Sequence, residues 1–120
     1  MMRMPAGVRD KFIQVSAERK FKKAAFSICQ GLTPDIIEGM AHRRMSLDKL
    51  LGQTGRAIQK PSGATRLGVD YLMGLPHERI MELLEDVVPE HVAVLRRYPV
   101  YTTQFTADLK QWVARLLTSP

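Results

Sequence analysis

The sequence contains a single cysteine, Cys29, in 120 residues. One cysteine excludes a disulfide within the chain and suits the reducing interior of a cell. No stretch approaches the roughly 18 consecutive apolar residues that a membrane-spanning helix needs. The first ten residues also lack the apolar run of a signal peptide. We therefore expect a cytoplasmic protein without a membrane partner.

The patterns that mark metal and catalytic sites are also missing. The three histidines, His42, His77 and His91, have no partner at metal-ligand spacing, and Cys29 has no second cysteine nearby. Cys29 lies in an apolar helical pattern, which is typical of a small buried side chain rather than a nucleophile. The acids of residues 78–86 fit the solvent side of an amphipathic helix better than acid–base catalysis. We expect no enzyme activity, no metal and no cofactor.

Positive charge is concentrated in the first half of the chain. Residues 1–60 carry 12 Lys and Arg against 5 Asp and Glu (12 − 5 = +7), whereas residues 61–120 carry 6 against 7 (6 − 7 = −1). Hydrophobic residues at 45% and charged residues at 25% are ordinary for one globular domain. The uneven charge indicates a part that faces a polyanion and a part that faces another partner, although a solvated basic surface would look the same.

Apolar residues recur at helical spacing along the chain, and no convincing strand-like alternation is present. Neither glycine nor proline occurs between Gly7 and Gly31. The apolar face nevertheless changes, because Val8, Phe12 and Val15 fall roughly opposite the later set Phe21, Ala24, Ala25 and Ile28 at about 100° per residue. This pattern predicts two helices, 6–18 and 21–30, with a break between residues 17 and 23.

A capped short helix is expected to follow Gly31. Thr33 is a good N-cap, Pro34 suits the first helical position, and Asp35 complements the positive end of a helix. The pattern predicts a buried face and a polar face for this helix. The buried face comprises Ile36, Ile37, Met40 and Ala41, and the outer face Glu38, His42, Arg43 and Arg44.

Further helices are expected after Ser46, over residues 67–75, and after each of the prolines Pro76 and Pro89, with a last one near 103–117. The most flexible-looking segment is 59–66. In the last helix, Phe105, Leu109, Trp112 and Leu116 are spaced by four, three and four residues, which is typical of a buried stripe.

The order of these elements is similar to that of a known family. Ser27, Gly31 and Ile37 stand at the spacing of a small residue, a turn glycine and a buried apolar residue, and "MSLDKLL" and "LGVDYLMGL" follow them. In these features the chain resembles the phage-repressor-like (lambda repressor/Cro type) helix-turn-helix family over about residues 6–75. The resemblance implies a helix that braces the DNA backbone and a next helix that enters the major groove.

The resemblance also implies a set of DNA contacts. The groove-facing residues would be Thr33, Pro34 and Glu38, and the phosphate contacts Arg43, Arg44, Lys20, Lys22 and Lys23.

The sequence therefore predicts an all-α small multi-helix bundle. Residues 1–75 would form a repressor-like helix-turn-helix body, and residues 76–120 a helical extension that carries a homodimer or partner contact. The predicted function is DNA binding in transcriptional control, of the repressor or antitoxin kind. The alternative is a non-enzymatic helical subunit or adaptor whose basic face binds RNA or an acidic protein. Exposure of the polar side chains of residues 33–44 would favour the regulator.

Overall fold

Every regular element that can be described in this chain is a helix. The computed structural model describes the backbone of residues 6–49 and 66–118, with no strand in these ranges. The all-α bundle predicted from the sequence is confirmed. The helices are α1 (Ala6–Gln30), α2 (Pro34–Arg43), α4 (Arg66–Met73), α5 (His77–Val87), α6 (Pro89–Arg96) and α7 (Pro99–Thr118).

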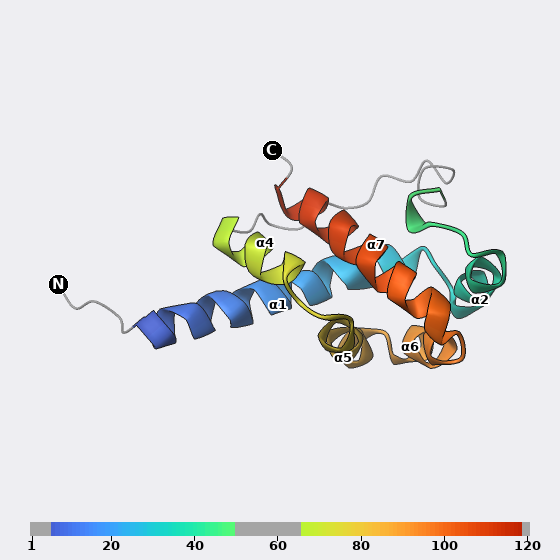
Figure 1. Ribbon diagram of the computed structural model, residues 1–120, viewed down its shortest axis with the longest axis horizontal. Coiled ribbons are helices and arrows are strands. Elements are labelled where there is room, and N and C mark those ends of the chain that lie inside the picture. Colours follow the sequence, from blue (N-terminus) through green and yellow to red (C-terminus); the bar gives the residue numbers. More distant parts are fainter. Residues whose placement is uncertain (1–5, 50–65, 119–120) are drawn as a thin grey trace.

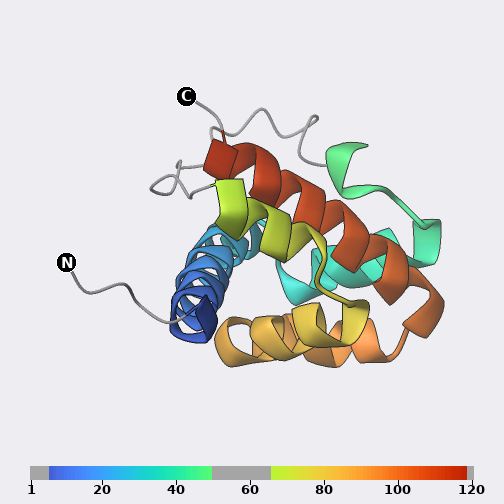
Figure 2. The same ribbon diagram turned by 60° about the vertical axis from the view of Figure 1, so that its left-hand side comes forward.

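The helices surround one core and leave part of α1 uncovered. Helices α4 and α7 lie next to each other, and α5 packs against α1, α6 and α7. Helix α2 packs on α6 at the end of the molecule away from the start of α1 (Figure 1). In Figure 2, α5 and α6 run below α4 and α7, with α1 along one flank. The first half of α1 projects beyond the other helices (Figure 1).

The expected break between residues 17 and 23 is wrong, because α1 is one continuous helix of 25 residues. Its second half supplies the buried stripe, with Phe21, Ala24 and Ala25 at 0% exposure. Phe12 and Val15 lie on the opposite face and remain 67% and 48% exposed. The apolar face changes because the earlier residues face solvent, and no breaker interrupts the backbone hydrogen bonds. The two-helix start implied by the resemblance is therefore absent.

Helix α2 begins as the sequence predicts. The Thr33 hydroxyl accepts a hydrogen bond from the Ile36 amide at 3.3 Å, and Pro34 occupies the first turn. Ile37, Met40 and Ala41 are buried. Ile36, expected on the same buried face, is instead 40% exposed, because it lies one residue before the stripe that contacts the core.

Residues 76–118 are helical, as predicted, but they are not an appendage to a separate body. One continuous core joins side chains from both halves of the chain. Phe21 and Leu72 come from the first half, and Leu84, Leu95 and Phe105 from the second. Side chains from both sides of the expected boundary after Leu75 therefore pack in the same core, so this boundary does not separate two domains.

Two further expectations concern boundaries. The helix expected over 67–75 is α4, and the last helix begins at Pro99 rather than near residue 103. Pro99 follows the end of α6 and is the first residue of α7. Proline has no amide hydrogen, and it fits this position because the amides of the first helical turn have no partner within the helix. Most of the helix expected after Ser46, and the segment 59–65, lie outside the described residues.

Candidate nucleic-acid interface

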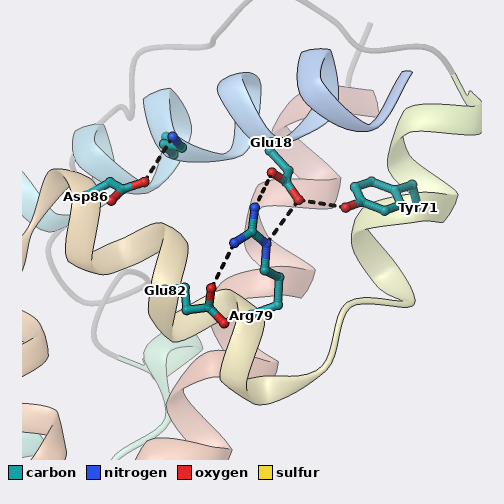
Figure 3. A network of polar contacts seen from close by, with 6 residues as sticks. Glu18, Tyr71, Arg79, Glu82 and Asp86 are labelled. Atoms are coloured by element: carbon teal, nitrogen blue, oxygen red, sulfur yellow. Dashed lines mark hydrogen bonds and ion pairs between the residues drawn. The ribbon is translucent and has the colours of Figure 1, made fainter. Parts of the chain in front are cut away.

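A polar clamp fixes α1 against α4 and α5. The Glu18 carboxylate accepts two hydrogen bonds from the Arg79 guanidinium, at 2.7 and 3.2 Å, and one from the Tyr71 hydroxyl at 2.6 Å (Figure 3). Arg79 also reaches Glu82 at 2.9 Å. The Glu18 side chain is only 15% exposed. Burial raises the pKa of this carboxyl, but the bonds from Arg79 and Tyr71 outweigh it, so the pKa lies below the ordinary value.

The packing of α5 against α1 also determines which of the expected lysines can contact a ligand. Lys22, expected to contact phosphate, instead pairs with Asp86 of α5 at 3.2 Å. Lys20 is partly buried, whereas Lys23 is exposed on the outer face of α1. At about 100° per residue, Lys20 and Lys22 are about 200° apart around the helix, so the three expected lysines cannot share one surface. Of the three, Lys23 is the exposed one.

The outer face of α1 carries a stripe of aromatic and basic side chains. We call it the outer stripe; it comprises Phe12, Val15, Arg19, Lys23, Phe26 and Gln30, all of them exposed. Their spacing of three or four residues places them along one side of the helix. From Phe12 to Phe26 the stripe extends about 21 Å, at 1.5 Å per residue. It contains no acidic residue.

Acids elsewhere are partly neutralised by internal pairs. Arg96 pairs with Glu85 at 2.7 Å, and Arg115 with Asp48 at 3.6 Å. Together with the clamp and the Lys22 pair, these contacts involve five of the twelve acids of the chain. The basic charge on the outer stripe has no such partner among the described residues. The stripe therefore carries two positive charges flanked by two aromatic rings.

The outer face of α2 is only partly free. Glu38, expected in the groove, is half-buried and accepts a hydrogen bond from the Tyr98 hydroxyl at 3.1 Å. The same hydroxyl lies 2.9 Å from His42 Nε2, and the two rings meet edge to face. Tyr98 thus ties α2 to the junction of α6 and α7, and reading a base with Glu38 would require this contact to open.

The other expected contacts at α2 lie at opposite ends of the helix. The Thr33 hydroxyl is used as the N-cap, and Pro34 is half-buried beside it. Arg43 and Arg44 lie at the other end, about 15 Å away along a helix of ten residues. Arg44 adopts the left-handed conformation, with φ 50° and ψ 40°, and ends the helix. The structure does not bring these residues together with the lysines of α1 into one contiguous cluster.

A pocket of about 250 Å³ lies where the C-terminal end of α1 meets the junction of α5 and α6. Its lining comprises Phe26, Cys29, Gln30, Val87, Val88, Pro89, Glu90 and His91. Cys29 is 2% exposed, and burial raises the pKa of its thiol to about 12, which suppresses thiolate chemistry. The prediction that Cys29 is a small buried side chain is confirmed.

His91 caps the end of α1 from α6. Its Nε2 lies 3.1 Å from the Cys29 carbonyl oxygen and 2.5 Å from that of Leu32. Carbonyl oxygens only accept hydrogen bonds, so Nε2 carries a proton and donates. The other ring nitrogen, Nδ1, is buried and has no partner within the described chain.

Within residues 6–49 and 66–118, no group of three or more His, Cys, Asp or Glu side chains could hold a metal ion. No helix there is long and apolar enough to cross a bilayer.

Sequence reasoning missed the outer stripe and the pocket for different reasons. Phe12 and Val15 belong to the apolar face predicted over residues 8–15, and apolar residues at helical spacing usually mark a buried face. Arg19 lies between residues 17 and 23, where the sequence predicted a break. The pocket joins residues about 60 positions apart in the chain, so no local pattern marks it.

No family model, curated protein or solved structure matches this chain.

Proposed function

We propose that this protein is a non-catalytic nucleic-acid-binding protein that holds single-stranded RNA or DNA along the outer stripe of α1. The observation that carries the proposal is one exposed helix face on which two basic side chains, Arg19 and Lys23, lie between two aromatic rings. Phe12 and Phe26 offer rings on which bases can stack, and Arg19 and Lys23 between them can meet phosphates. This pairing of stacking rings with basic groups is how proteins bind single strands without sequence preference.

Other partners fit the stripe less well. A membrane surface favours a helix with a continuous apolar face, whereas Arg19 and Lys23 interrupt this one between its two phenylalanines. A second copy docking through the same face would bring these like charges together. An acidic protein would satisfy the charge but leaves the exposed rings without a specific role. A single-stranded polyanion with stackable bases uses both features.

A second candidate is duplex DNA binding in transcriptional control. It is favoured by the three-residue turn before α2, the Thr33 cap, and the exposed Arg43 and Arg44 at the end of that helix. In this case α2 would approach the major groove, and a homodimer through residues 76–120 would place two such helices on symmetric half-sites. Glu38 would have to give up its hydrogen bond from the Tyr98 hydroxyl in order to contact a base.

Fluorescence anisotropy with labelled single-stranded and duplex oligonucleotides at several salt concentrations tests both candidates. We expect the double variant Arg19→Ala/Lys23→Ala to weaken single-strand binding to all sequences. The slope of log affinity against log salt should become shallower by about 1.4, or about 0.7 per lost phosphate contact. The matched control is Arg66→Ala/Arg97→Ala, which removes the same charge from exposed positions on other elements and should change the slope much less.

The variant Arg43→Ala/Arg44→Ala separates the two candidates. If the protein acts on duplex DNA through α2, this variant loses duplex affinity and its salt slope becomes shallower by roughly two units, while the α1 variant binds normally. Unchanged affinity and slope for Arg19→Ala/Lys23→Ala on single strands would overturn the proposal for the outer stripe.

A further inference from the structure

The pocket beside α6 opens at one end of the outer stripe. Phe26 and Gln30 belong to both, because they lie on the outer face of α1 and also line the pocket. Phe26 is 45% exposed, and Pro89 and Glu90 are exposed on the opposite wall, so the mouth lies at the surface. Cys29 and Val88 are buried and close the inner side. A strand that follows the stripe would therefore reach the pocket.

The size of the pocket suits a small group. Drug-sized ligands occupy pockets of about 300–1,000 Å³, and this pocket, at about 250 Å³, is smaller. Most of its lining residues are apolar or aromatic, so it suits a ring rather than a charged headgroup. A phosphate would find no described basic side chain in the lining, whereas Lys23 lies three residues before Phe26, just outside it.

The accessible polar groups of the pocket are Glu90 and Gln30, both exposed at its mouth. Glu90 contributes a carboxylate, which only accepts hydrogen bonds, and Gln30 an amide that can both donate and accept. His91 also lines the pocket, but its Nε2 already donates to the end of α1, and its Nδ1 is buried. A ligand that brings an N–H group can therefore pair with the carboxylate of Glu90.

We propose that this pocket binds one unpaired nucleobase that bears an exocyclic amino group, namely cytosine, adenine or guanine rather than uracil or thymine. The base stacks against Phe26, its amino group donates to the Glu90 carboxylate at the mouth, and its phosphate lies near Lys23. This inference rests on the nucleic-acid binding proposed above. It adds base preference to a surface that otherwise binds any single strand.

The test compares homopolymeric oligonucleotides of cytidine, adenosine and uridine by fluorescence anisotropy. Wild type should bind the cytidine and adenosine strands about tenfold more tightly than the uridine strand, because one well-placed hydrogen-bonded contact discriminates by about that factor. Phe26→Ala should raise the Kd for cytidine and adenosine strands at least about fivefold and remove most of the preference. Glu90→Gln should reduce the preference, because an amide can also donate to the carbonyl groups of uracil.

Phe12→Ala is the matched control on the same stripe. It removes an identical ring about 21 Å from Phe26 and should weaken binding to all strands alike without changing the preference. A direct readout comes from adding cytidine or uridine monophosphate to the full chain and following the backbone amide signals of Cys29 and His91. Cytidine monophosphate should shift both signals at lower concentration.

The outcomes separate the two proposals. Equal affinity for every homopolymer, together with equal effects of Phe26→Ala and Phe12→Ala, would overturn the base pocket. Binding along the outer stripe would still stand in that case if Arg19→Ala/Lys23→Ala binds single strands weakly. Normal binding by Arg19→Ala/Lys23→Ala would overturn the stripe itself. In that case a monophosphate effect at Cys29 and His91 would show a nucleotide pocket that acts without the strand.

Discussion

At the scale of single residues, the clamp around Glu18 shows how one carboxylate can join three helices. Glu18 lies on α1, Tyr71 on α4 and Arg79 on α5, and all their polar ends meet within hydrogen-bond distance. Glu18 holds its bonds in a partly buried setting, where water competes less for them. Arg79 also pairs with Glu82, one helical turn away on α5, and the Glu82 side chain is 63% exposed. This exposed ion pair contributes less to stability than the hydrogen bonds to Glu18.

Replacing Glu18 should therefore cost far more stability than replacing Glu82. We expect Glu18→Gln to lower the free energy of unfolding by about 1–3 kcal/mol, because the charge-assisted hydrogen bonds from Arg79 lose their charged, partly buried acceptor. The control Glu82→Gln should cost less than about 1 kcal/mol. Urea unfolding at neutral pH measures both, and equal effects would contradict the role of the clamp.

The pH dependence of this difference has a definite sign. The pKa of Glu18 in the folded chain lies below its ordinary value of 4.5, so the unfolded chain binds the proton more readily. The stabilisation is therefore present above 4.5 and is lost as the pH falls through the folded value. Wild type and Glu18→Gln should approach each other in stability as the solution is acidified.

At the scale of elements, α1 is the feature that most changes the interpretation of the chain. The sequence predicted a break because the apolar face changes between residues 17 and 23, where the charged run Glu18-Arg19-Lys20 lies. They are also good helix formers, and a run without glycine or proline gives no reason to stop. The helix therefore continues, and its first half extends beyond the body (Figure 1).

Glycine substitution at Arg19 tests this continuity. Inside a helix, Arg19→Gly should be less stable than Arg19→Ala by about 1 kcal/mol, because glycine loses more backbone freedom on folding. Arg19 is exposed, so both variants remove the same solvent-facing side chain. Urea unfolding of the pair gives the difference. Equal stability of the two variants would indicate a break near residue 19.

At the scale of the whole molecule, the core decides how the chain may be divided. Buried side chains of α5, α6 and α7 meet those of α1 and α4 in one cluster. A fragment that ends at Leu75 would lose partners such as Leu84, Phe105 and Leu109, and would expose Phe21 and Leu72 to water. Exposure of that much apolar surface removes the main driving force for folding.

The fragment 1–75 should therefore not fold by itself. We expect its amide spectrum to lack dispersion and its thermal unfolding to lack a cooperative transition, in contrast to the full chain. The sequence alone predicted that residues 1–75 form a body of their own and that residues 76–120 carry the homodimer or partner contact. A fragment with a cooperative transition would restore the boundary after residue 75, and sedimentation of the full chain at high concentration would then test the predicted homodimer.

Local patterns determined the helical class, the start of α2 and many of the buried faces. Thr33 caps because its hydroxyl meets an amide three residues ahead, and Ile80, Leu83 and Leu84 are buried because their spacing places them on one side of α5. These outcomes depend on neighbours within about one helical turn, so the sequence contains what they need.

Only the tertiary structure decided which apolar face of α1 is buried, which lysine is free and where the pocket lies. Lys22 and Lys23 are adjacent in sequence, yet one pairs with Asp86 and the other faces solvent, because α5 packs on one side of α1. Glu38 meets Tyr98 across 60 residues, and His91 meets Cys29 across 62. Such contacts depend on how helices pack, and single-sequence periodicity does not define that packing.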